Sequence, residues 1–168
     1  KYRLFLRLFP TAKKLAAASP RSVLGVWHGL GYNRRALFLQ SAAQKIQSEF
    51  RGIFPKDRAL LETLPGVGKY TARAVSVFAW NRPEVFIETN IRRVFIHFFF
   101  PRKESVSDGD LLPFVEKALW RENPRRWYWA LMDYGALALK GLPNPNRKSA
   151  HYARQSRFLG SRRYARAK

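Results

Sequence analysis

Cysteine is absent from the sequence, and acidic residues are scarce: its 168 residues contain 11 Asp+Glu against 32 Lys+Arg. Without cysteine the chain cannot form a disulfide, a thiolate zinc site or a cysteine-ligated iron–sulfur cluster. The three histidines have no metal-ligand spacing, so we expect no metal site. No apolar run reaches the roughly 18–20 residues of a membrane span, and no signal peptide opens the sequence. These absences predict a soluble, cytoplasmic protein with no membrane partner.

The sequence does contain a large hydrophobic fraction, 46%, and an aromatic fraction of 15%. A disordered polybasic tail would be poor in both kinds of residue, so this composition predicts a folded protein. The length fits one domain, or two small lobes that share a junction.

The positive charge is spread along the whole chain. The formal net charge is +21, of which residues 140–168 carry nine positive charges with no acidic residue, and the first 139 residues carry +12. Basic residues interleaved with aromatic ones are typical of a surface that contacts nucleic-acid phosphates. A basic ribosomal or nucleoid protein would account for the charge equally well. No segment pairs a basic face with a long apolar face, which disfavours a membrane-surface protein.

Apolar residues recur at intervals of three and four along several segments, which predicts amphipathic helices. The pattern is clearest in residues 39–50, 111–119 and 127–134, and the Ser-Pro pair at 19–20 is a typical helix start. No segment shows sustained strand alternation, and we therefore predict an all-α fold. The Pro-Asn-Pro-Asn sequence at 143–146 predicts the end of the last helix and the start of an extended basic tail.

A glycine-containing turn, Leu-Pro-Gly-Val-Gly at 64–68, separates two expected helices at 57–63 and 69–80. Glycines at alternate positions allow a tight turn whose N–H groups approach a ligand closely. The second helix begins at once, so its unpaired N–H groups and positive dipole end face the same point. A plain turn between helices would also favour Pro and Gly. The phosphate-binding candidates are Gly66, Val67, Gly68, Lys69 and Arg73.

Four motifs in a fixed order resemble the endonuclease III superfamily of DNA glycosylases. LPGVGKYTA at 64–72 resembles its helix–hairpin–helix, and FIETNIRRV at 86–94 resembles its catalytic segment. WHGLGYNRRA at 27–36 and ALMDYGA at 130–136 resemble the Gly-Leu-Gly-Tyr turn and the helix before the iron–sulfur loop of MutY-type adenine glycosylases. The resemblance implies a helix–hairpin–helix glycosylase fold, with the active-site cleft between two helical lobes.

The resemblance also implies a domain organisation. We expect the start of the glycosylase domain at 1–20 (truncated at its N-terminus), one lobe at 21–100 that contains the hairpin (57–80) and the catalytic segment (86–95), a second lobe at 101–142, and a basic tail at 143–168 in place of the iron–sulfur loop.

A glycosylase must break a C1′–N bond through a sugar with oxocarbenium character, on a base swung out of the duplex. The resemblance assigns Glu88 to stabilise the cationic sugar or bond to it transiently, and Asn90 to orient that carboxylate. Without the other motifs, both residues would be read as a helix cap. The family usually has Asp where this chain has Glu88, which adds about 1.5 Å of reach. Either the pocket is adjusted for glutamate, or the activity is weak.

Tyr70 stands where bifunctional relatives have a lysine that forms a Schiff base, so we predict a monofunctional enzyme. Its hydroxyl could hydrogen-bond near the sugar. The neighbouring Lys69 is turned away by a helical step of about 100°. Leu30 and Tyr32 resemble the family's wedge, which replaces lost base stacking, although Tyr32 could simply pack at a helix start. Further basic DNA contacts are expected at Arg34, Arg35, Arg147, Lys148 and Arg154.

Two features depart from the family's pattern. Aligned without gaps from the Gly-Ala pair at 135–136, the four cluster cysteines are replaced by Leu139, Asn146, Ser149 and Gln155. We therefore expect no iron–sulfur cluster and no other cofactor, with a monovalent cation at the hairpin left open. The segment that carries the family's leaving-group acid would precede Lys1, so this chain is expected to be a fragment that binds DNA and turns over poorly.

The expected function is base-excision repair: a monomer that removes adenine opposite 8-oxoguanine or guanine from double-stranded DNA in the bacterial nucleoid. Two alternatives stay open. One is a thymine or uracil mismatch glycosylase of the same superfamily, because Tyr70 suits both chemistries. The other is a non-catalytic helix–hairpin–helix module that binds DNA.

Overall fold

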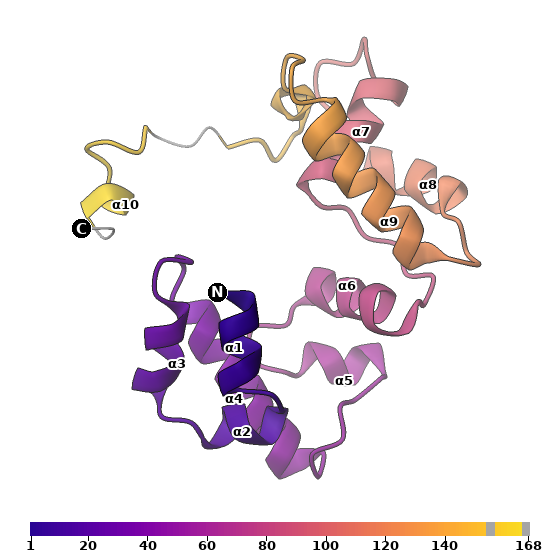
Figure 1. Ribbon diagram of the computed structural model, residues 1–168. Helices are drawn as coiled ribbons and strands as arrows, with labels where there is room; N and C mark the ends of the chain where they lie inside the picture. Colours follow the sequence, from indigo (N-terminus) through magenta and orange to yellow (C-terminus); the bar gives the residue numbers. More distant parts are fainter. Residues whose placement is uncertain (154–156, 166–168) are drawn as a thin grey trace. The chain divides into compact units, whose positions relative to one another are not determined.

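The structure is a computed structural model that describes residues 1–153 and 157–165. All the secondary-structure elements in these residues are helices (Figure 1). The all-α prediction is therefore confirmed. The elements are α1 (Tyr2–Leu8), α2 (Ala12–Ala17), α3 (Pro20–Trp27), α4 (Arg34–Glu49), α5 (Arg58–Glu62), α6 (Lys69–Trp80), α7 (Thr89–Phe99), α8 (Asp108–Ala118), α9 (Pro124–Asp133), a π-helix (Tyr134–Ala138), a 3₁₀ helix (Pro145–Lys148) and α10 (Arg162–Ala165). No described helix has the length and apolar character that a membrane span requires.

The chain divides between Ala72 and Arg73 into two compact units, which we call unit 1 and unit 2. The sequence predicts a lobe boundary between residues 100 and 101, with the catalytic segment in the same lobe as the hairpin. In the structure α7 instead packs with α8 and α9 in unit 2 (Figure 1). The reason is the apolar face of α7, which is buried in the core of unit 2.

Unit 1 is built around α2, α3 and α4, which contribute a core of Leu15, Val23, Ala36 and Ala43. The expected start of α3 is confirmed, because the Ser19 hydroxyl accepts the Ser22 N–H at 3.2 Å and Pro20 occupies the first helical position. A local capping signal therefore fixes where α3 begins.

In the core of unit 2, the largest fully buried side chain is Tyr128 of α9. The ring of Tyr128 stacks on Phe86 at 4.0 Å between centroids. The tyrosine hydroxyl accepts the Phe86 N–H at 3.0 Å and donates to the Glu84 carbonyl at 3.1 Å. Burial raises the pKa of Tyr128 to about 12, so it stays a neutral donor. These contacts hold the segment that leads into α7.

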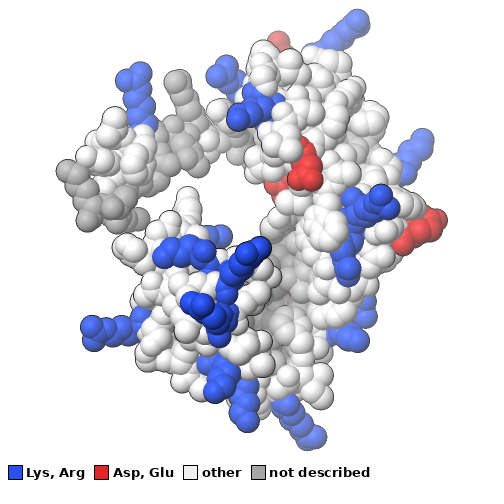
Figure 2. Space-filling view, in the orientation of Figure 1, with Lys and Arg blue, Asp and Glu red and all other residues white. Residues whose placement is uncertain are grey.

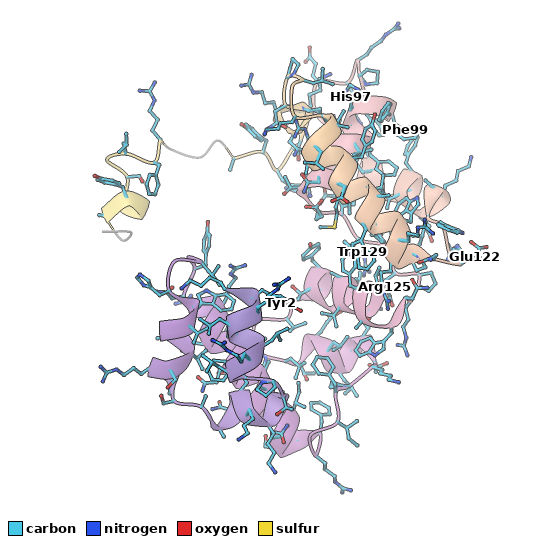
Figure 3. The ribbon with its side chains drawn as sticks, viewed as in Figure 1. Tyr2, His97, Phe99, Glu122, Arg125 and Trp129 are labelled. Atoms are coloured by element: carbon cyan, nitrogen blue, oxygen red, sulfur yellow. The ribbon has the colours of Figure 1, made fainter. Side chains whose placement is uncertain are left out.

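The beginning of α9 is tied to the end of α6 within unit 2. Arg125 Nη2 donates to the Ala79 carbonyl at 3.0 Å, and the Trp129 ring stacks on Phe78 at 6.2 Å. Figure 3 shows Arg125 and Trp129 on the side of α9 that faces α6. The start of α8 carries a capping box, in which the Ser107 hydroxyl and the Asp110 carboxylate cap each other's backbone N–H groups.

The prediction of an extended tail from residue 143 onward is wrong for residues 143–150. The Asn144 side chain accepts the Asn146 N–H at 3.1 Å and starts the 3₁₀ helix, in which Asn146 is buried. Val106 donates to the Lys148 carbonyl at 2.7 Å, and Ala150 donates to the Val106 carbonyl at 2.9 Å. These hydrogen bonds join residues more than 40 positions apart in the sequence, and they fold residues 143–150 into unit 2.

Candidate functional site

The Leu-Pro-Gly-Val-Gly turn at 64–68 joins α5 to α6, as predicted. Gly66 has φ +78°, and a Cβ on this residue would lie 2.7 Å from the Cβ of Phe38 in α4. Both the backbone conformation and the close packing therefore require glycine at 66. A Cβ on Gly68 would meet no described heavy atom within 4 Å. The hairpin thus packs on α4 through Gly66 and has open space at Gly68.

The first turn of α6 continues from this hairpin. Val67 donates to the Leu64 carbonyl at 3.0 Å, and Ala72 donates to the Gly68 carbonyl at 2.9 Å. The first N–H groups of a helix have no acceptor in a preceding turn, and the helix dipole gives them extra positive charge. Lys69 and Tyr70, the first two residues of α6, are exposed. This arrangement suits an anion such as a phosphate.

Arg73, which the sequence suggested as a further cation at the hairpin, makes a different contact. Its Nη1 donates to the Val85 carbonyl at 2.9 Å, and its Nε atom is buried without a hydrogen-bond partner among the described residues. The side chain therefore supports the segment before α7 inside unit 2. Arg73 is therefore not part of the candidate phosphate site.

The loop after α3 holds its backbone in an unusual conformation. Gly29 and Gly31 have φ of +86° and +70°, and Tyr32, which is not a glycine, has φ +51°. The side chains of Leu30 and Tyr32 are 45% and 74% exposed. A positive φ at a bulky residue is strained and often marks a functional position. The loop therefore presents two apolar side chains outward, as a wedge requires.

A stacked group of side chains supports this loop. Trp27 Nε1 donates to the Gly31 carbonyl at 3.0 Å. The guanidinium carbon of Arg35 lies 5.4 Å from the centroid of the Trp27 ring and 5.7 Å from that of Tyr32. These are cation–π contacts, so Arg35 already has a role in positioning Tyr32. Arg34 is exposed beside it.

Glu88 is the N-cap of α7 in unit 2. Its Oε1 accepts the N–H of Asn90 at 2.6 Å and the N–H of Ile91 at 2.9 Å. The side chain is half-buried, and no hydrogen bond to its Oε2 is seen in the part of the chain that is described. The helix dipole stabilises negative charge at this position. The residue is thus a helix cap and, through Oε2, a fixed carboxylate that can face a developing positive charge.

The sequence alone missed the side chains that hold α7. Arg92 forms two hydrogen bonds with the Asp108 carboxylate, at 2.8 and 2.9 Å. Arg93 donates to the Gly135 carbonyl, and Asn146 donates to the carbonyl of Thr89 at the start of the helix. The arginines were visible in the motif, but their partners lie 16 or more residues away and no local pattern identifies them.

An iron–sulfur cluster, which the family resemblance implies, does not fit the residues that are present. Leu139 has no donor atom and is 2% exposed, and the Asn146 amide is engaged with the Thr89 carbonyl. Ser149 is buried, and Gln155 lies outside the described residues. Across residues 1–153 and 157–165, no group of three or more His, Asp or Glu side chains could hold a metal ion.

The basic residues differ in how far they are free to bind a partner. Arg147 is exposed, whereas Lys148 is half-buried and donates to the Pro101 carbonyl. Arg154 lies outside the described residues. Residues 1–72 carry 13 Lys+Arg against 3 Asp+Glu, and residues 73–168 carry 19 against 8. Figure 2 shows basic side chains over α1 to α4 on the face in view.

Each unit therefore brings together one set of candidate residues. Unit 1 contains the hairpin, the wedge loop and the exposed arginines that follow it. Unit 2 contains Glu88, Asn90 and the folded segment around Arg147.

Residues 1–110 match the HhH-GPD superfamily base excision DNA repair protein family. An adenine DNA glycosylase of Mycolicibacterium smegmatis is 47% identical over 90 residues, which cover 54% of this chain and 31% of the relative. Another, from Buchnera aphidicola subsp. Baizongia pistaciae, is 33% identical over 154 residues, which cover 86% of this chain and 42% of the relative. The chain thus spans less than half the length of these curated relatives.

The fold is also similar to that of a solved thermostable thymine-DNA glycosylase. The TM-score is 0.74 and the identity 24%, over 85% of this chain and 68% of that chain.

Proposed function

Because the chain belongs to the HhH-GPD superfamily of base excision DNA repair proteins, we propose that it is a monofunctional DNA glycosylase. Its proposed substrate is adenine mispaired with 8-oxoguanine or guanine in double-stranded DNA of the bacterial nucleoid. The choice of adenine rests on the similarity to adenine DNA glycosylases over up to 86% of the chain.

The observation that carries this proposal is the Glu88 carboxylate at the start of α7. Two backbone N–H groups, those of Asn90 and Ile91, fix one of its oxygens. Breaking the C1′–N bond leaves positive charge on the sugar, and a carboxylate fixed beforehand stabilises that charge without reorganisation. Asn90 contributes through its N–H to the orientation of the carboxylate.

The cap also supports a glutamate in place of the family's usual aspartate. The Glu88 side chain folds back over the N–H groups of its own helix. Part of the added reach of about 1.5 Å is then used in the cap. The pocket would in this way accept glutamate without a large shift of the reacting carboxylate.

Unit 1 supplies most of the proposed DNA contacts, and Arg147 of unit 2 adds one. The N–H groups around Val67 and Gly68, with Lys69 beside them, suit a backbone phosphate. Leu30 and Tyr32 are exposed as a wedge for the space left by an extruded base. Arg34 and Arg147 are exposed cations for further phosphates, and the protein works as a monomer.

Tyr70 supports a monofunctional reaction. A phenol cannot form a Schiff base with the sugar, so water completes the hydrolysis and the DNA backbone stays intact. Tyr70 is exposed in the first turn of α6, directly after the hairpin that is proposed to bind DNA. We include no iron–sulfur cluster in this proposal, because the residues at its expected positions have no thiolate.

The test is a single-turnover assay on four duplexes that contain A:8-oxoG, A:G, T:G or U:G. We expect release of adenine, with strand breaks only after treatment with alkali. Release of thymine or uracil alone would instead establish the mismatch alternative. Tight binding without release from any duplex, both by this chain and by a version extended upstream, would favour a DNA-binding module.

A further inference from the structure

The start of α7 carries Glu88 and Asn90 and is contacted by a segment that lies 40 to 60 residues further along the chain. This segment begins at the π-helix Tyr134–Ala138 and ends at the 3₁₀ helix Pro145–Lys148, all within unit 2. Three of its contacts reach the first turn of α7 or the residue just beyond it.

The first contact is a close approach of two backbones. Gly135 is buried, and a Cβ on this residue would lie 2.5 Å from the carbonyl oxygen of Asn90 and 2.9 Å from its Cβ. Any side chain at 135 must therefore push the Asn90 peptide away. Gly135 lies in a π-helical turn, and such turns occur frequently at functional sites.

The second contact is made by Arg93, one turn into α7. Its Nη1 donates to the Gly135 carbonyl at 3.0 Å, and its Nη2 donates to the Leu139 carbonyl. Charge-assisted hydrogen bonds are stronger than neutral ones. Arg93 thus holds both ends of the π-helical turn against the helix that carries Glu88.

The third contact comes from Asn146, which is 7% exposed. Its Nδ2 donates to the carbonyl of Thr89, the residue that follows Glu88, at 3.0 Å. Its Oδ1 is buried and has no hydrogen-bond partner among the described residues. A buried acceptor without a partner destabilises the fold. An asparagine at 146 therefore does not maximise the stability of the fold. This favours a role for its hydrogen bond to Thr89 in positioning the start of α7.

We propose that Gly135, Arg93 and Asn146 are positioning residues that fix the first turn of α7, so that the Glu88 carboxylate is held in its reactive orientation. The inference rests on the proposed function of Glu88. The residues at the family's cluster positions do not fit an iron–sulfur cluster. In this chain the Arg93 guanidinium and the Asn146 amide instead join the segment 134–148 to α7. These three residues then control the rate of base release and leave the affinity for DNA unchanged.

The test compares three variants of the full chain: Gly135→Ala, Asn146→Ala and, as a matched control, Gly141→Ala. Gly141 lies in the same segment, and a Cβ there would meet no described heavy atom within 4 Å. A misplacement of about 1 Å can reduce a catalysed rate by about a hundredfold. We expect the single-turnover rate to fall at least about tenfold in the first two variants, with an unchanged Kd for the duplex. The control should behave as the wild type.

A second measurement does not depend on activity. Hydrogen exchange of the Asn90 and Ile91 amides, which bind Glu88, should accelerate in Asn146→Ala and stay unchanged in Gly141→Ala. If Gly135→Ala does not fold, Asn146→Ala still decides the question, because it removes one hydrogen bond without adding bulk.

Unchanged release and unchanged exchange in folded Asn146→Ala would overturn the inference. A parallel loss of release and of DNA affinity would also overturn it, since that result indicates a purely structural role. If the wild type releases no base, the proposed function fails, and accelerated exchange would still establish that these residues fix the start of α7.

Discussion

The candidate residues of unit 1 are exposed on turns, whereas those of unit 2 are held in place by several segments of chain. Leu30 and Tyr32 project from a loop whose backbone has positive φ at three of four residues. Glu88 is instead fixed by hydrogen bonds to its own helix, and that helix is tied to distant parts of unit 2. The two units thus differ in how firmly their candidate residues are held in place before a ligand binds.

This difference matches the two tasks proposed for the units. A surface that grips a flexible polyanion can adjust after contact, and affinity depends chiefly on charge and accessible N–H groups. A carboxylate that stabilises a transition state must be oriented in advance, because any reorganisation adds to the barrier. The comparison therefore predicts large effects on rate in unit 2 and effects on binding or folding in unit 1.

The largest expected effect is that of Glu88→Gln in unit 2. The glutamine keeps a carbonyl oxygen that accepts the N–H groups of Asn90 and Ile91, so the helix cap and the fold should survive. The charge is lost, and we expect base release to slow by about 10³-fold with little change in DNA affinity. Single-turnover rates and a fluorescence-based Kd measure the two quantities.

Glu116→Gln is the matched control for this prediction. Glu116 is an exposed residue of α8 that forms an ion pair with Arg121 at 3.8 Å. This variant should release base at the wild-type rate. Equal rates for Glu88→Gln and the wild type would remove the chemical role assigned to unit 2.

Capping signals and the hairpin could be predicted from the sequence because they act over a few residues. Asp57 accepts the Leu60 N–H, and Ser19 accepts the Ser22 N–H, each across three residues. The turn at 64–68 is equally local, since Gly66 is required by its own backbone conformation. The four family motifs could be recognised for the same reason.

Contacts between distant segments could not be predicted in this way. Asn146 binds the Thr89 carbonyl across 57 residues, and Arg73 turns to Val85 rather than to the hairpin. The Pro-Asn-Pro-Asn sequence signals a break in the helix, but nothing local indicates that Val106 pairs with the segment beyond it. Burial decided these positions, and burial is a property of the whole fold.

The next largest effect contrasts the two glycines of the hairpin in unit 1. Gly66→Ala places a methyl group 2.7 Å from Phe38 and forces a positive φ on alanine, so we expect a loss of about 2–3 kcal/mol of stability. Gly68→Ala has open space, and its stability should stay within about 0.5 kcal/mol of the wild type. Thermal unfolding followed by circular dichroism measures both.

The order of the two variants should be reversed for DNA affinity: Gly68→Ala should weaken the Kd more than Gly66→Ala does. The methyl group on Gly68 would cover the accessible side of the hairpin, so a weaker Kd is expected even though the fold is intact. An unchanged Kd for Gly68→Ala, over a range of salt concentrations, would indicate that the phosphate binds elsewhere in unit 1.

A smaller effect is expected for Tyr32→Gly in the wedge loop. Glycine removes the strain of φ +51° but also removes the cation–π contact with Arg35 and makes the unfolded chain more flexible. These terms are of similar size, so stability should change by less than about 1 kcal/mol. Stacking on an aromatic ring is worth about 1–3 kcal/mol, and binding of a mismatched duplex should weaken about tenfold. A tenfold loss on fully paired DNA as well would show that Tyr32 is a general contact rather than a wedge.

The smallest effect concerns a cap in unit 2 that resembles the one at Glu88 but lies on the surface. The Asp110 carboxylate caps α8 and is 2.8 Å from Lys103 Nζ. Hydrogen bonding to Lys103, followed by the bonds to Ser107, lowers the pKa of Asp110 from 3.8 to about 2. A lowered pKa in the folded state stabilises the protein above the unfolded value, and this stabilisation is lost as the pH falls from 3.8 through about 2.

Asp110→Asn should therefore unfold at a lower temperature than the wild type at pH 5 to 7, and the two melting temperatures should converge as the pH approaches 2. The asparagine keeps an acceptor for the Ser107 N–H, so the pH-dependent part of the difference reports the charge alone. Base release by Asp110→Asn at neutral pH should equal that of the wild type, because this cap lies on α8 and not on the helix that carries Glu88. A difference in melting temperature that stays constant between pH 2 and 7 would assign the effect to packing. A slower base release would indicate that the start of α8 also helps to position Glu88. The connection would run through Arg92 of α7 and Asp108 of α8, which are hydrogen-bonded to each other.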